Sequence, residues 1–175
     1  TTYNGANQAN TFAITGGQLF GSDTLTGITG LASGTNAGSY NDALSGATGT
    51  GLNNYTIGYV NGSLTIGKAA LTLTGGNRAV TYNGTSQSNG AATLMGVQGS
   101  DSFTITGVAS GTNAGSYADA LDIIANGSTL ASNYTLGVTN GGLTIDKAGL
   151  TITGATTVTT YNGANQANTF AITGG

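Results

Sequence analysis

The chain has 175 residues, of which only 5% are charged: six Asp, three Lys or Arg in all, and no Glu, His, Cys or Pro. Without His and Cys the chain has no Ser-His or Cys-His nucleophile and no His- or Cys-ligated zinc site, so we expect no enzyme. A net charge of −3 gives no electrostatic surface for nucleic acid, and no apolar run approaches the roughly 18 residues that membrane insertion needs.

Internal repetition is the strongest signal along the chain. Residues 1–17 return unchanged as residues 159–175, and a Tyr-Asn-Gly motif recurs at steps of 79 residues. Its copies are Tyr3-Asn4-Gly5, Tyr82-Asn83-Gly84 and Tyr161-Asn162-Gly163. Three further landmarks recur at 77 to 79 residues, beginning at Ala32 and Ala109, at Asn54 and Asn133, and at Leu64 and Leu143. The chain is therefore a tandem repeat.

Short segments alternate apolar and hydroxylated residues at a period of two, which is typical of strands with one buried face. They are Ser63–Ile66, Leu71–Thr74, Phe103–Thr106 and Leu150–Thr153. Asn61-Gly62 and Asn140-Gly141 each separate two such runs, so both dipeptides predict a type I′ hairpin. The fold class is thus predicted to be all-β.

Domain boundaries are predicted at Lys68-Ala69 and Lys147-Ala148, where a closing strand runs almost directly into an opening strand. Residues 1–68 then form a domain that lacks its first strand, 69–147 a complete domain, and 148–175 the opening strands of a third. With so little linker, neighbouring domains should be joined stiffly. We expect the chain to be a fragment whose secretion segment lies outside it.

Two architectures fit this strand pattern. The first is a tandem row of small Ig-like β-sandwich domains in an elongated array. The alternative is a β-grasp-like domain with one short helical turn at Tyr117–Leu121.

The order of these motifs is similar to that of the MBG (YDG-type) repeats of large bacterial surface adhesins, including those of the filamentous-haemagglutinin, two-partner-secretion kind. The resemblance covers the whole chain, although Asn replaces the family's usual Asp after the first Tyr in all three copies. It implies a structural stalk in a cell-surface or biofilm-matrix adhesin and brings no catalytic residues. The motif residues, all given structural roles, are Tyr82, Asn83, Gly84, Asn113, Gly115, Tyr117, Asn133, Tyr134, Asn140, Gly141 and Lys147.

Calcium is the one metal ion that these side chains could hold, because it needs only oxygen ligands. Asp119 and Asp122 could share an ion with Asn126, but repeat one matches only Asp42 there. Residues 16–23 are faintly similar to a calcium-binding nonapeptide, with the wrong spacing. We interpret these Asp residues as turn formers and expect no cofactor or metal, with calcium as the alternative.

The tyrosines also have two interpretations. Tyr40 and Tyr117 follow Ala-Gly-Ser and are predicted to be corner residues whose hydroxyls hydrogen-bond to a nearby backbone group. Tyr3, Tyr82 and Tyr161 are open to a second role as exposed aromatic contacts for a sugar ligand.

The leading functional hypothesis is a passive spacer in an extracellular fibre on a bacterial surface or in its matrix, with neighbouring repeats of the same chain as its partners. One alternative is a repeated carbohydrate-binding module that contacts matrix polysaccharide. The other is a self-assembling filament subunit, in which copies of the chain complete each other's domains.

Overall fold

The computed structural model describes residues 1–174, and it confirms the all-β prediction. Strands account for 44% of the chain, and the described residues include no α-helix. Two compact units are formed, the first from residues 1–74, 93–106 and 121–139 and the second from 75–92, 107–120 and 140 onward. This division cuts through the predicted domain 69–147, because its two opening strands, residues 69–74 and 77–81, join different sheets.

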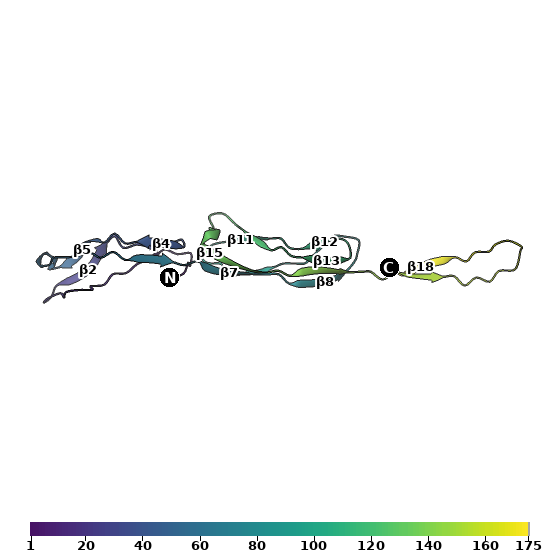
Figure 1. Ribbon diagram of the computed structural model, residues 1–175, viewed down its shortest axis with the longest axis horizontal. Coiled ribbons are helices and arrows are strands. Elements are labelled where there is room, and N and C mark those ends of the chain that lie inside the picture. Colours follow the sequence, from purple (N-terminus) through teal and green to yellow (C-terminus); the bar gives the residue numbers. More distant parts are fainter. Residues whose placement is uncertain (175) are drawn as a thin grey trace. The chain divides into compact units, whose positions relative to one another are not determined.

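The first unit contains a three-stranded sheet built around β7 (Ala69–Thr74). This strand pairs antiparallel with β10 (Thr93–Met95) and parallel with β15 (Tyr134–Thr139), which lies beside it in Figure 1. A separate antiparallel pair joins β11 (Phe103–Thr106) to β14 (Asp122–Ala125). The opening strand of repeat 2, the name used here for residues 69–147, is therefore the centre of its sheet.

The same unit holds repeat 1, which comprises residues 1–68, and its strands form antiparallel pairs. The pairs are β1 (Gln8–Ala9) with β3 (Ser33–Gly34), β2 (Thr24–Thr29) with β5 (Ser45–Thr50), and β4 (Gly38–Asn41) with β6 (Ser63–Ile66). The segments that match β10 and β15, residues 12–16 and 55–60, are not strands in repeat 1. Among the described residues, no strand of repeat 1 takes the place that β7 has in repeat 2.

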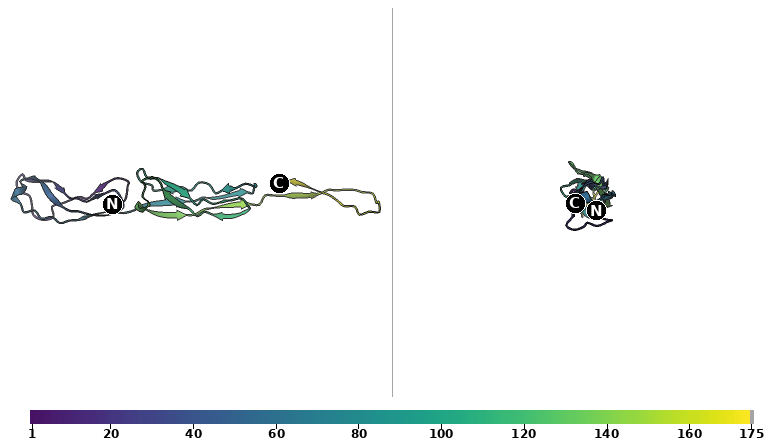
Figure 2. Two further views of the ribbon diagram at one scale, coloured as in Figure 1. Left: turned by 90° about the horizontal axis from the view of Figure 1, so that it is seen from above. Right: turned by 90° about the vertical axis from the view of Figure 1, so that its left-hand side faces the viewer.

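The second unit contains the other sheets of repeat 2 and the start of repeat 3, which begins at residue 148. β16 (Gly142–Asp146) lies between β13 (Gly115–Ala118) and β8 (Asn77–Thr81), and β9 (Gln87–Ser88) pairs with β12 (Ser110–Gly111). In repeat 3, β17 (Thr151–Gly154) and β18 (Phe170–Gly174) form an antiparallel pair, seen in yellow-green to yellow in Figures 1 and 2.

Burial follows the predicted alternation where strands have neighbours on both sides. Leu71 and Leu73 are 1% and 0% exposed, whereas Thr72 and Thr74 between and after them face solvent. One core cluster lies in the first unit, and a smaller one around Leu143 and Ile145 lies in the second. Apolar residues at alternate positions thus fill the interior and leave the β-branched Thr side chains solvated.

The predicted Asn-Gly hairpins are wrong. β15 pairs with β7, while β16 pairs with β8 and β13, so the strands on either side of Asn140-Gly141 belong to different sheets. None of the described non-glycine residues has a positive φ, and a type I′ turn would require one at the Asn. The backbone N–H of Gly141 instead donates to Asp119, which fixes a crossing between sheets.

The helical turn considered at Tyr117–Leu121 is also wrong, because Tyr117 lies in β13. Single 3₁₀ turns occur instead at η1 (Leu52–Asn54) and η2 (Ala131–Asn133), each directly before the Tyr of an Asn-Tyr pair. These turns set the position of Tyr55 and Tyr134 for the contacts described next.

Candidate functional site, a tyrosine and aspartate junction between repeats

The most elaborate side-chain arrangement lies where repeat 1 meets repeat 2 within the first unit. The hydroxyls of Tyr3 and Tyr134 both donate to Oδ2 of Asp101, at 2.8 and 2.6 Å. The Tyr134 hydroxyl also accepts the backbone N–H of Gln98 at 3.0 Å. One carboxylate thereby joins a tyrosine from each repeat, and hydrogen bonds to charged groups are stronger than neutral ones.

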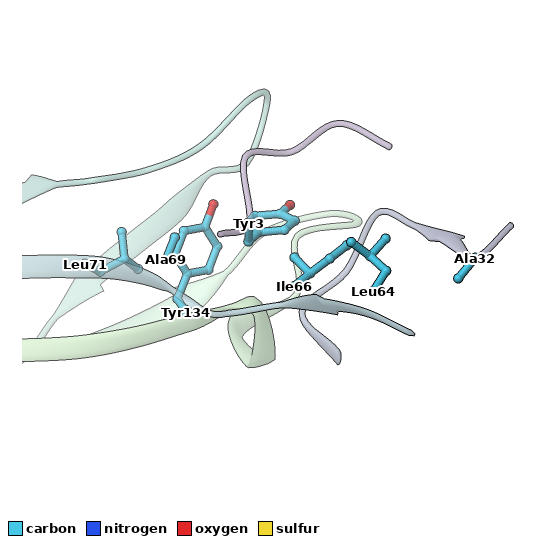
Figure 3. Close-up of a cluster of buried hydrophobic side chains, with 7 residues drawn as sticks. All are labelled: Tyr3, Ala32, Leu64, Ile66, Ala69, Leu71 and Tyr134. Atoms are coloured by element: carbon cyan, nitrogen blue, oxygen red, sulfur yellow. The ribbon is translucent and has the colours of Figure 1, made fainter. Parts of the chain in front are cut away.

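Aromatic packing supports the same contact. The rings of Tyr3 and Tyr134 meet edge to face with centroids 5.3 Å apart, and Phe103 meets Tyr134 in the same way at 5.4 Å. Figure 3 shows Tyr3 and Tyr134 side by side, between Ala69 and Leu71 on one side and Ile66 and Leu64 on the other. Aromatic pairs of this geometry contribute about 0.5–1.5 kcal/mol beyond their buried area.

The surroundings of the two hydroxyls resist ionisation. Burial, followed by the hydrogen bond to the Asp101 carboxylate, raises the pKa of Tyr134 from 10.0 to about 12. The pKa of Tyr3 is raised by the same two causes. Both tyrosines therefore stay neutral donors at physiological pH, which suits a structural contact and not acid-base chemistry.

A second contact between the repeats centres on Asn133, which is 2% exposed. Its Oδ1 accepts the backbone N–H of Ala37 at 2.9 Å, and its Nδ2 donates to Oδ1 of Asn36 at 3.0 Å. Gly5, at φ +77°, also approaches Gly99, where an added Cβ would lie 3.0 Å from the Gly99 Cα atom. The Gly of the Tyr-Asn-Gly motif thus permits both a turn and a close contact.

Repeat 1 contains half of this junction. The Tyr55 hydroxyl donates to Oδ2 of Asp23 at 2.9 Å and accepts the N–H of Phe20 at 2.8 Å, as Tyr134 does with Asp101 and Gln98. No second tyrosine donates to Asp23 in the described structure. Asn54, the counterpart of Asn133, is exposed.

The tyrosines of the three Tyr-Asn-Gly motifs also differ in how far they are buried. Tyr3 is 6% exposed, while Tyr82 and Tyr161 are 42% and 90% exposed. The prediction that Tyr3 offers an exposed sugar contact is therefore wrong, because its ring and hydroxyl are engaged by repeat 2. For Tyr82 and Tyr161, which are exposed, the sugar-contact hypothesis stays a prediction.

Asp42 and Asp119 are the buried carboxylates of the two repeats, and each accepts three hydrogen bonds. Asp119 accepts from the N–H groups of Ala109 and Gly141 and from Nδ2 of Asn89, at 2.8 to 3.1 Å. Asp42 has the equivalent donors, and the hydrogen bond from the Ala32 backbone is the main cause that lowers its pKa. These residues connect distant segments, which is a larger role than the local turn predicted for them.

The positions of the Asp side chains do not support the alternative that this chain binds calcium. Within residues 1–174 no cluster of three or more Asp residues lies close enough to hold an ion. Asp122 Oδ1 accepts the adjacent N–H of Ile123.

The corner prediction for Tyr40 and Tyr117 is confirmed. Each hydroxyl donates to the backbone carbonyl four residues earlier, that of Asn36 and of Asn113, at 2.9 Å. A Cβ at Gly34 or Gly111 would lie 2.3 Å from the ring of the corresponding tyrosine. The recurring Ser-Gly-Thr-Asn-Ala-Gly-Ser-Tyr run is thus one packing motif, and Gly111 matters more to it than the predicted Gly115.

The remaining predicted motif residues have local roles. Asn83 Oδ1 accepts the N–H of Thr85 at 3.0 Å, and Gly84 follows at φ +78°, which confirms a turn at this motif. Lys147 is exposed. Asp23 and Asp101 were missed as partners of the tyrosines, although a Gly-Ser-Asp run recurs at residues 21–23 and 99–101 and could have drawn attention to them.

Comparison of the chain with protein-family models, with curated proteins and with solved structures gave no significant match. No helix among residues 1–174 is long and apolar enough to cross a membrane. The site is therefore interpreted from its own geometry.

Proposed function

We propose that this chain is a structural spacer segment of a giant bacterial adhesin, displayed outside the cell on its surface or in a biofilm matrix. In this proposal the repeats are MBG-like, Ig-like β-sandwich domains joined in series into an elongated fibre. The repeats themselves contribute length and stiffness and not chemistry.

The junction of Tyr3, Asp101 and Tyr134 carries this proposal. A hydrogen-bonded, aromatic contact between consecutive repeats limits their independent motion, which is what a spacer requires and what a set of freely tethered binding modules does not. Its components recur in both repeats, as Tyr82 for the first tyrosine and as Asp23 with Tyr55 for the acceptor. The near absence of charged, His and Cys side chains agrees with a passive role.

Display can be tested on intact cells that express the full-length parent protein. An antibody raised against the folded chain should label unpermeabilised cells, and the distance of immunogold particles from the envelope should grow with the number of repeats. Labelling that requires permeabilisation, or a distance independent of repeat number, would contradict a spacer.

The carbohydrate-binding alternative is favoured by one observation, the exposure of Tyr82 and Tyr161. A glycan array probed with a multivalent form of the chain distinguishes the two roles. Binding that is lost on Tyr82→Ala supports a lectin function, and the spacer hypothesis expects no binding.

A further inference from the structure

The chain contains seven Asn-Gly dipeptides, which share a chemical weakness. The backbone nitrogen of Gly has no neighbouring Cβ to shield it, so it can attack the side-chain amide of the Asn before it. Whether it does so in a folded protein depends on the direction of the Gly N–H bond and on the space around it. The dipeptides begin at Asn4, Asn61, Asn83, Asn89, Asn126, Asn140 and Asn162.

In two of these dipeptides a buried carboxylate holds the Gly nitrogen. The N–H of Gly62 donates to Oδ2 of Asp42 at 3.1 Å. The N–H of Gly141 donates to Oδ2 of Asp119 at the same distance, 3.1 Å. The electron pair that attacks lies along the former N–H bond, so in both places it points at the carboxylate and not at the Asn side chain. The Asn of each of these dipeptides is therefore protected.

The dipeptide Asn126-Gly127, which lies in repeat 2, lacks this protection. Gly127 is exposed, and a Cβ added to it would have no atom within 4 Å. Its N–H has no hydrogen-bond acceptor among residues 1–174. Asn126 Oδ1 accepts the hydroxyl of Thr104 at 3.0 Å, and this donor stabilises the negative charge that develops on the oxygen during attack. The nitrogen, the space and the carbonyl partner thus all favour ring closure at Asn126.

The remaining four dipeptides do not have this combination of features. Asn89 is 8% exposed, and its Nδ2 donates to the carbonyl of Gly76 and to Oδ2 of Asp119, so the leaving group is held away from water. In the three Tyr-Asn-Gly copies the Asn Oδ1 accepts the N–H two residues later. That hydrogen bond fixes the side chain in a local turn, which has to open before the ring closes.

Asn126 also belongs to a closed ring of three hydrogen bonds beside Asp101. The N–H of Asn126 donates to the carbonyl of Ser102 at 3.0 Å, and the N–H of Ser102 donates to Oγ1 of Thr129 at 3.0 Å. The N–H of Thr129 donates back to the carbonyl of Asn126 at 3.1 Å. Ser102 is the neighbour of Asp101 in the sequence, so this ring holds the segment that carries the acceptor of both junction tyrosines.

We propose that Asn126 deamidates spontaneously in the folded protein and that the product loosens the junction between the repeats. The nitrogen of Gly127 loses its proton and attacks Cγ of Asn126, while the Cγ–Nδ2 bond breaks and ammonia leaves with that proton. Water then opens the succinimide ring, which gives Asp by cleavage at Cγ or isoaspartate by cleavage at the backbone carbonyl. Isoaspartate lengthens the main chain by one carbon and turns the acceptor of Thr129 into a free carboxylate. The ring of hydrogen bonds beside Asp101 then loses its register.

Peptide mapping by mass spectrometry of the whole chain, incubated at mildly alkaline pH, tests the reactive site. In the folded chain Asn126 should convert at least about tenfold faster than Asn61 and Asn140, because those two sites must first break the hydrogen bond from Gly to the carboxylate. In guanidinium chloride the three rates should become similar, since Gly follows Asn at each site. A rate at Asn126 no higher than at the other two in the folded chain, or a difference that persists after unfolding, overturns the proposal.

Two variants test the effect of the modification on the junction. Gly127→Ala places a Cβ beside the attacking nitrogen and should slow the conversion of Asn126 about tenfold. Asn126→Gln should abolish it, because Gln would have to close a larger ring. After incubation of the parent chain, the Gln98 N–H, which donates to the Tyr134 hydroxyl, should exchange with deuterium faster than before. In both incubated variants this exchange should rise less, and an equal rise in parent and variants, or no rise in the parent, overturns the proposed effect on the junction.

Discussion

Asp23 and Asp101 occupy equivalent places in the two repeats, but they accept different sets of hydrogen bonds. Asp101 binds the hydroxyls of Tyr134 and Tyr3, whereas among residues 1–174 the one tyrosine hydroxyl that binds Asp23 is that of Tyr55. Tyr134 is 5% exposed, and its counterpart Tyr55 is only partly buried. The comparison shows that Tyr134 is buried where Tyr3 of the preceding repeat supplies a second hydroxyl and β7 supplies an apolar strand, whereas Tyr55 has neither beside it.

The largest expected loss of stability comes from a substitution in β7, the central strand of its sheet in repeat 2. Leu73→Ala removes a fully buried side chain from β7 and should lower the free energy of unfolding by about 2–5 kcal/mol. Urea denaturation of the whole chain measures this, with the exposed Thr72→Ala as the matched control. A loss below about 1 kcal/mol would show that β7 is not the centre of the sheet.

The second largest loss of stability is expected at Asp101, the carboxylate that joins the two repeats. Asp101→Ala leaves two tyrosine hydroxyls without their acceptor and should cost about 2–3 kcal/mol, against about 1 kcal/mol for Asp23→Ala, which leaves one partly buried hydroxyl. Both variants are measured by the same urea titration. Equal losses would mean that Tyr3 contributes nothing to the stability of repeat 2.

Removal of single tyrosine hydroxyls from the two repeats should have smaller effects on stability. Tyr3→Phe removes one hydrogen bond to Asp101 and keeps the ring contact with Tyr134, so it should cost about 1 kcal/mol. Tyr82→Phe should change the stability of the monomer by less than about 0.5 kcal/mol, because that side chain is exposed. A larger effect at Tyr82 than at Tyr3 would contradict the assignment of the junction.

Alkaline titration perturbs the junction without any substitution. A tyrosine whose pKa is raised in the folded state contributes stability below its unfolded pKa of 10.0, and this contribution is lost as the pH rises to the folded value of about 12 for Tyr134. Ultraviolet absorbance should show Tyr3 and Tyr134 ionising above pH 10.0, with loss of stability over that range. Asp101→Asn should lower the ionisation pKa of both tyrosines, and an absorbance titration that is unchanged by this substitution would contradict the assigned hydrogen bonds.

Much of the fold could be predicted from periodicity and repetition. The alternation at Leu71–Thr74 gave the correct strand and the correct buried face, since this pattern depends only on local geometry. The corner role of Tyr117 could also be predicted, because its acceptor lies four residues away. Both features depend on residues that lie close together in the sequence.

Pairing between distant segments could not be predicted in the same way. Asn140-Gly141 has the composition of a hairpin turn, but the strands before and after it pair with other strands and belong to different sheets. Asp101 lies 98 residues from Tyr3 and 33 from Tyr134, and no local pattern indicates that one carboxylate serves both. The junction depends on long-range packing that only the folded chain reveals.

Only Gly67 and Lys68 separate the last strand of repeat 1 from the first strand of repeat 2. In a gene that encodes such repeats, an in-register crossover adds or deletes one repeat length wherever it occurs. Each new boundary then has the same two-residue link between a closing strand and an opening strand. Recombination can thus change the length of an array while every internal joint is kept.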